Sequence, residues 1–138
     1  KLAEKASPNS PILKDTALAF LFGGVICSIG QILINIYGNF GLEKETASAL
    51  GSISLIFLSV LLTALNVFDN IAKHAGAGTI VPITGFANSV ASPAIEFKSE
   101  GFVLGAAANM FKIAGPVIVF GIVASVIYGI IYWATTLF

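Results

Sequence analysis

Residues that could carry out catalysis are scarce in this sequence, and their spacing assembles no catalytic centre. Cys27 is the only cysteine and His74 the only histidine among 138 residues. A metal site built from several thiolates or imidazoles therefore lacks ligands within the chain. There is no H-E-x-x-H motif and no Ser-His dyad, and the apolar runs hold no paired aspartates. We therefore expect no enzyme activity, no cofactor and no firm metal site.

Polar residues inside apolar sequence indicate a different chemistry, the passage or binding of a polar solute. Lipid offers no hydrogen bonds, so such side chains must face protein or water. The amide of Gln31 needs several partners. Lys112 requires water, an acidic partner or the membrane interface, and snorkelling to a nearby surface is the simpler explanation for it. We take these pore or substrate candidates: Gln31, Thr79, Thr84, Asn88, Ser89, Asn109 and Lys112.

Two helical stripes of small and polar residues run along the first two apolar segments. The first stripe is Gly24, Ser28, Gln31 and Asn35, and the second is Ser52, Ser59, Thr63, Asn66 and Asn70. Such stripes line a pore or, as favoured here, hold helices together. A third set, Gly121, Ser125 and Gly129, repeats every four residues and is typical of close helix packing. The charged segment Glu96, Lys98 and Glu100 is either a solvated turn or an ion-gathering mouth.

The composition identifies the solvent in which these residues must be placed. Hydrophobic residues make up 57% of the chain and charged residues only 10%, against about 25% charged residues in soluble domains. The formal net charge is zero and arginine is absent, which argues against a nucleic-acid partner. The chain is therefore predicted to be an all-α integral membrane protein, with the bilayer as its main partner.

Charge-free runs predict the membrane segments. Residues 1–15 form a polar segment, and residues 16–138 a single polytopic membrane domain. Residues 16–36, 49–68 and 117–138 are each long enough to cross a bilayer core of about 30 Å. Lys1, Lys5 and Lys14 precede the first span, whereas the first loop holds one lysine. The positive-inside rule therefore places the N-terminus in the cytoplasm.

Residues 75–113 differ from these spans because glycine and proline interrupt them. Gly76, Gly78, Pro82, Gly85 and Pro93 break the first half, and residues 101–113 are too short to span alone. We predict a broken re-entrant hairpin, with Pro116 marking the start of the last span. The alternative is four spans, in which residues 75–94 cross outright. Irregular backbone at membrane depth needs protein or water beside it, so this hairpin is the strongest functional signal.

This region contains three long motifs. They are H-A-G-A-G-T-I-V-P-I-T-G-F-A-N-S at residues 74–89, A-I-E-F-K-S-E-G-F-V-L-G at 94–105 and N-M-F-K-I-A-G-P-V-I at 109–118. A further run, G-G-V-I-C-S-I-G-Q, lies at residues 23–31. Together they resemble the SpoVAC/SpoVAEb family of stage V sporulation membrane proteins. The polar N-terminal extension, F-A-N-S and N-M-F-K favour the SpoVAC branch of the family.

The resemblance implies a multi-subunit complex of the forespore or spore inner membrane. That complex moves dipicolinic acid, with Ca²⁺, into the developing spore and releases it at germination. Implied partners are SpoVAEb, the soluble subunit SpoVAD and other SpoVA subunits. Three spans cannot enclose a wet path, so we expect a homo- or hetero-oligomeric gated pore. On this view Lys112 attracts a carboxylate, while Glu96 and Glu100 gather Ca²⁺. A non-conducting scaffold subunit and a small transporter of another substrate are the alternatives.

Overall fold

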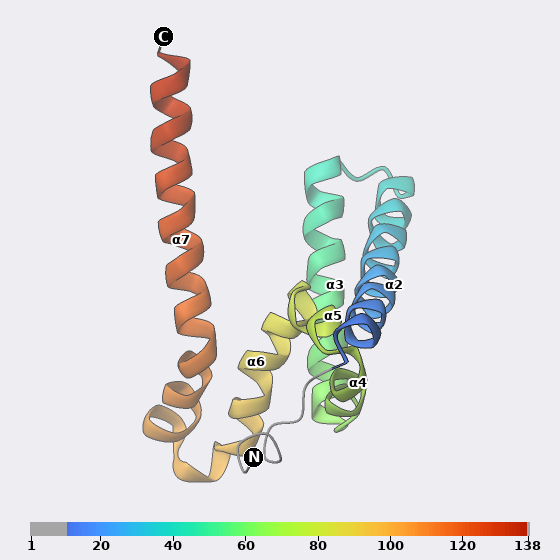
Figure 1. The fold of residues 1–138 in the computed structure, drawn as a ribbon, viewed down its shortest axis with the longest axis vertical. Coiled ribbons are helices and arrows are strands. Elements are labelled where there is room, and N and C mark those ends of the chain that lie inside the picture. Colours follow the sequence, from blue (N-terminus) through green and yellow to red (C-terminus); the bar gives the residue numbers. More distant parts are fainter. Residues whose placement is uncertain (1–10, 138) are drawn as a thin grey trace. The chain divides into compact units, whose positions relative to one another are not determined.

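The computed structural model describes residues 11–137, which contain helices and no strands (Figure 1). The chain divides between Asn88 and Ser89 into two compact units. We call them the N-terminal unit and the C-terminal unit and describe each by itself. The expected polar segment 1–15 lies outside the described residues except for its last five. Of these, Pro11 precedes helix α2, which begins at Ile12.

The N-terminal unit is built on a helical hairpin of α2 (Ile12–Asn39) and α3 (Lys44–Ala64). A short loop joins them, and Gly41 takes a φ of 82° there, a conformation that glycine adopts without a side-chain clash. Small buried residues let the two helices approach: Gly30, Ala47 and Gly51. A Cβ added at Gly51 would lie 2.7 Å from Cγ1 of Ile34. The Tyr37 and Ser54 hydroxyls, 2.7 Å apart, also link the pair.

After α3 the backbone is broken into short pieces that pack on the hairpin. These are α4 (Phe68–Ala75), α5 (Ala77–Ile80) and the first part of α6 (Ile83–Glu96). Helix α5 lies directly on α2, since a Cβ at Gly78 would meet the carbonyl oxygen of Ala19 at 2.4 Å. Only a glycine tolerates this backbone-to-backbone approach. The expected interruption is present at Gly76 and next to Pro82. Gly85 and Pro93 do not break the chain as expected, because both lie inside α6.

The C-terminal unit starts within α6 and continues through two irregular turns into one long helix. The turns are η1 (Lys98–Glu100) and the π-helix η2 (Phe102–Ala107), and the long helix is α7 (Ala108–Thr136). Gly101, between the turns, has φ 99° and ψ 162°, a region that is essentially restricted to glycine. Gly105 packs against the backbone of η1, because an added Cβ would lie 2.8 Å from the Glu100 carbonyl carbon.

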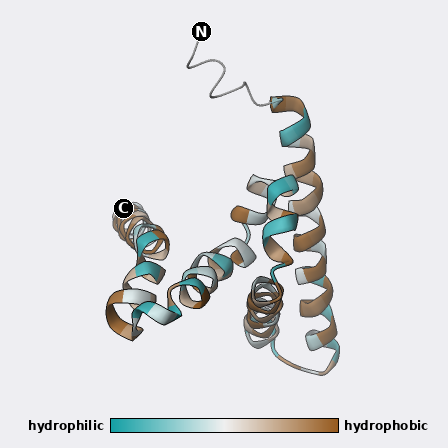
Figure 2. Ribbon diagram, turned by 90° about the horizontal axis from the view of Figure 1, so that it is seen from below, coloured by the Kyte–Doolittle hydropathy of each residue, from teal (hydrophilic) through white to brown (hydrophobic). Residues whose placement is uncertain are grey.

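Three helical segments of residues 11–137 are long and apolar enough to cross a membrane: Ile12–Asn39, Lys44–Ala64 and Phe102–Thr136. In Figure 2, α2 has a hydrophilic band near its start and is hydrophobic along most of its length. The expectation of an all-α protein with three membrane-length helices is confirmed. Residues 75–94 do not form one helix, because breaks follow Ala75 and Ile80. Whether this region is re-entrant stays a prediction.

All three expected spans differ in their bounds from the structure. The first, expected at residues 16–36, covers Ile12–Asn39. The second helix covers Lys44–Ala64 and not residues 49–68. Lys44 and Glu45 are good helix formers, and an acidic residue stabilises a first turn, while the chain leaves the helix before Asn66, whose φ is 57°.

The expected start of the last span at Pro116 is also wrong, because Pro116 lies inside α7. The preceding residue is Gly115. It has no Cβ to clash with the proline ring, which removes part of the reason for a break. Residues 101–113 and 117–138 are therefore not two separate segments.

Candidate functional site

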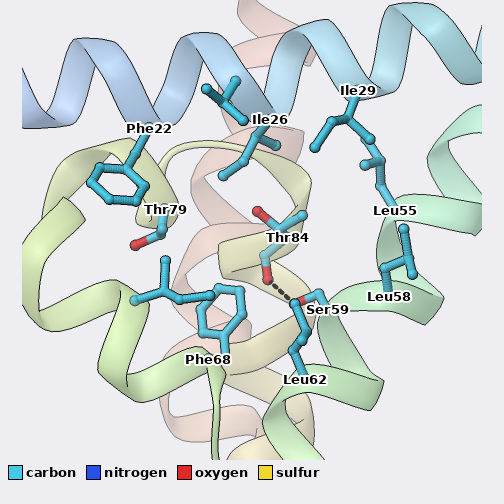
Figure 3. A pocket seen from close by; sticks show the side chains of 12 residues that line it. Phe22, Ile26, Ile29, Leu55, Leu58, Ser59, Leu62, Phe68, Thr79 and Thr84 are labelled. Atoms are coloured by element: carbon cyan, nitrogen blue, oxygen red, sulfur yellow. Dashed lines mark hydrogen bonds between the residues drawn. The ribbon is translucent and has the colours of Figure 1, made fainter.

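A cavity of about 280 Å³ lies inside the N-terminal unit, between α2, α3 and the broken segment (Figure 3). Its wall is almost wholly hydrocarbon, from Phe22, Val25, Ile26, Ile29, Leu55, Leu58, Leu62, Phe68 and Ile71. The remaining lining residues are Ser59, Thr79 and Thr84. Two of the sequence candidates, Thr79 and Thr84, are therefore brought together at one apolar cavity.

The three hydroxyls of this cavity are buried but differ in their hydrogen bonding. Ser59 Oγ on α3 donates to the Thr84 carbonyl at 2.6 Å, which ties α3 to α6. Thr79 Oγ1 donates to the Gly76 carbonyl at 3.1 Å and so closes the turn into α5. Thr84 Oγ1 has no hydrogen-bond partner, although only 6% of the residue is exposed. An unpaired buried hydroxyl costs free energy.

One turn further along, Asn88 continues the contact between α3 and α6. Thr63 Oγ1 lies 2.8 Å from Asn88 Oδ1 and 2.8 Å from the Ser59 carbonyl oxygen. A hydroxyl has one proton, so both contacts are good hydrogen bonds when the Asn88 amide turns its NH₂ group toward Thr63. Asn88 therefore has a structural partner inside the unit.

Gln31 lies elsewhere, on an exposed face of α2. Its Nε2 donates to Asn35 Oδ1 at 2.9 Å, and Ser28 on the same stripe donates to the Gly24 carbonyl. The first predicted stripe is therefore present on α2, while the second ends early. Asn66 lies beyond the end of α3 and Asn70 lies on α4.

In the C-terminal unit, Asn109 and Lys112 lie at the start of α7 in different surroundings. Asn109 is buried and donates to the Gly105 carbonyl at 2.8 Å. Lys112 is exposed, with its Nζ 6.0 Å from the centre of the Phe97 ring, the range of a cation–π contact.

The other candidates of the C-terminal unit are less engaged. Glu96, Lys98 and Glu100 are all exposed, and Ser89 is half-buried. Along the predicted packing stripe, Ser125 donates to the Gly121 carbonyl at 2.8 Å. Gly121 and Gly129 have open space where a Cβ would stand. The stripe is thus uncovered within its unit, and its role in packing stays a prediction.

Comparison with known proteins decides which family this arrangement belongs to. Residues 15–131 match the family described as SpoVAC/SpoVAEB sporulation membrane protein. The chain belongs to this family. It is 52% identical over 128 residues to stage V sporulation protein AC of Bacillus subtilis (strain 168), covering 92% of this chain and 85% of that protein. No solved structure matches the chain significantly.

Family membership, together with three membrane-length helices, makes the chain a multi-pass sporulation membrane protein. Sequence reasoning found Thr79, Thr84 and Asn88. It missed that Ser59 binds the Thr84 carbonyl and that Thr63 binds the Asn88 side chain. Their four-residue spacing on the second stripe was the available signal. Nothing in the sequence marked Phe22 and Phe68 as residues that line the cavity, because each is one of many phenylalanines in apolar sequence. Within residues 11–137 no group of three or more His, Cys, Asp or Glu could hold a metal ion.

Proposed function

We propose that this SpoVAC/SpoVAEB-family protein is a non-enzymatic subunit of an oligomeric, gated pore in the spore inner membrane. Its cargo is dipicolinic acid with Ca²⁺, taken into the forespore and released at germination. The proposed partners are further copies of this chain, SpoVAEb, SpoVAD and other SpoVA subunits, with the N-terminus in the cytoplasm. The family resemblance supplies the cargo and the membrane, and the geometry supplies the argument for assembly.

The exposed amide pair Gln31 and Asn35 on α2 is the observation that carries the proposal. A primary amide has two donor hydrogens and an acceptor oxygen, yet the only bond here joins Gln31 to Asn35. Both side chains are exposed on a helix of membrane length. Hydrocarbon satisfies none of their remaining groups. This face of α2 therefore requires water or further protein, as a wall of a shared pore provides.

The cavity of the N-terminal unit is a poor path for the cargo. Dipicolinate is a dianion, and burying an unpaired charge among hydrocarbon side chains is very costly. The described wall of the cavity offers three hydroxyls and no cation. We therefore place the conduction path between chains. There, the exposed Lys112 meets the carboxylates of the cargo, and the exposed Glu96 and Glu100 concentrate Ca²⁺ at the mouth.

Spore content of dipicolinic acid tests this proposal. The gene of a spore former is replaced by one that encodes Gln31→Leu or Lys112→Ala, and the acid is measured in purified spores. Both variants are expected to accumulate several-fold less acid while inserting normally, which membrane fractionation checks. Ile32→Leu and Lys112→Arg are the matched controls, because they change the neighbouring exposed position and the shape of the cation. Wild-type content in both test variants would remove these residues from the pore.

A scaffold role is the second candidate, and one observation favours it. Thr63, Asn88 and Ser59 are used for bonds between helices of the same unit, and Thr79 closes a turn. Dipicolinate flux from liposomes separates the two roles. The liposomes contain this chain with SpoVAEb, or SpoVAEb alone. A pore subunit increases the flux and loses that increase on Gln31→Leu, whereas a scaffold gives flux that does not respond to this substitution.

A further inference from the structure

The apolar cavity of the N-terminal unit has a polar group that the fold does not use. Ser28, Ser52 and Ser125 each donate to the carbonyl four residues earlier, which is the usual arrangement for a hydroxyl in a helix. Thr84 Oγ1 does not do so and has no partner at all. The residue is 94% buried and lines the cavity, and Figure 3 places it in the middle of the lining side chains.

The neighbouring hydroxyls determine what would complement Thr84. The protons of Ser59 and Thr79 already bind backbone carbonyls, so these two oxygens offer only acceptor lone pairs. Thr84 has both its proton and its lone pairs free. The matching group is one that donates and accepts in the same place, which is a hydroxyl. A lone acyl chain would leave Thr84 unpaired.

The volume of the cavity and the route into it limit further which ligands can bind. A cavity of about 150 Å³ holds benzene, so about 280 Å³ has room for roughly ten non-hydrogen atoms. Val25, Ile29 and Leu58 on the lining are 50%, 42% and 41% exposed. They belong to α2 and α3, the membrane-length helices. The cavity is therefore reached from the hydrocarbon region, and its ligand must dissolve there.

We propose that this cavity binds a small apolar alcohol, aliphatic or aromatic, whose hydroxyl pairs with Thr84. The site is separate from the proposed conduction path, and its occupancy does not depend on whether the protein conducts. The hydrocarbon part of the ligand contacts Phe22, Ile26 and Phe68, and the hydroxyl supplies the hydrogen bond that the fold leaves open. Burial of apolar surface drives binding, and Thr84 provides selectivity for the alcohol.

Photolabelling of the full chain in lipid nanodiscs tests the site. The probe is cyclohexylmethanol with a diazirine at ring position 4, and the matched probe has an ethyl group in place of the hydroxymethyl group. Labelled residues are mapped by mass spectrometry, with labelling corrected for the amount of each probe in the membrane. Adducts from the alcohol probe are expected on α2 and α3 around the cavity, at about 2 to 12 times the yield of the ethyl probe.

Variants distinguish labelling at this cavity from non-specific labelling by a hydrophobic probe. Thr84→Val keeps the shape of the side chain and removes only the hydroxyl, so it should reduce the alcohol probe to the yield of the ethyl probe. Ile26→Trp fills the cavity and should abolish labelling by both probes. Thr135→Val, on α7, should change nothing. Equal yields from the two probes in the wild-type chain, or labelling spread evenly over α2, α3 and α7, would overturn the proposal.

Discussion

Helices α2 and α7 have nearly the same length, 28 and 29 residues, but very different neighbours within their units. Helix α2 packs against α3, α4 and α5, whereas α7 contacts mainly the π-helix η2 that precedes it. On α7 only Asn109 and Ala114 are buried. Because α2 is anchored by backbone contacts and α7 is not, substitutions on the two helices should have unequal effects on the fold. Most of α7 is therefore uncovered within its own unit.

The largest difference in stability is expected between substitutions at two glycines. Gly78→Ala places a Cβ 2.4 Å from the Ala19 carbonyl oxygen, and such overpacking costs about 1–3 kcal/mol. Gly121→Ala meets open space and should stabilise α7 by up to about 1 kcal/mol. Thermal unfolding in detergent measures both. Equal midpoints for the two variants would contradict the tight contact between α5 and α2.

A smaller contrast is expected at two serines with different hydrogen bonds. Ser59→Ala removes a buried bond between α3 and α6, and bonds between membrane helices contribute about 0.6 kcal/mol on average and at most about 1.7. Ser125→Ala removes an exposed bond within one helix and should leave the unfolding midpoint unchanged. A larger decrease of the unfolding midpoint for Ser125→Ala than for Ser59→Ala would contradict the closer packing of α3.

Thr84→Val should raise stability without ligand, in contrast to Ser59→Ala. It replaces an unpaired buried hydroxyl by a methyl group of similar shape, a change that is often neutral or stabilising by about 1 kcal/mol. The unfolding midpoint should therefore increase. A clear decrease would show that the hydroxyl already has a partner.

A further small effect concerns the contact between Lys112 and Phe97 in the C-terminal unit. Phe97→Leu should cost about 0.5–1 kcal/mol, the usual contribution of a cation–π contact at an exposed site. Lys112→Arg should preserve most of the contact, because a guanidinium also stacks on aromatic rings. Chemical unfolding of the two variants, followed by circular dichroism, compares them. Identical losses of stability in the two variants would contradict the expectation that a guanidinium preserves the contact.

The sequence was sufficient to predict the helical membrane class and the presence of three long helices, because charge-free runs report directly on the solvent. It also predicted a broken segment, which the structure shows at Gly76 and next to Pro82 but not at Gly85 or Pro93. Helix ends were less predictable. The end of α3 depends on Asn66 adopting a left-handed conformation, which no hydropathy pattern records. Pro116 continues a helix because Gly115 precedes it, and the stop signal of proline normally outweighs that detail.

The candidate site was only partly accessible to prediction, for a related reason. Thr79 and Thr84 were visible as polar residues in broken apolar sequence. That one hydroxyl is paired and the other is not depends on the positions of Gly76 and of α3, which are tertiary facts. Polarity along the chain indicates which groups need partners, and only the packing of helices decides which of them find one.

The proline inside α7 has one more consequence. Residue 116 has no backbone N–H, so the main-chain oxygen of Lys112, four positions earlier, lacks the donor that an uninterrupted helix would give it. An oxygen without its usual helical donor thus sits on the same exposed turn as an ammonium group. A neighbouring helix that brings an alcohol or amide proton to that turn would dock there more favourably than one with only methyl groups.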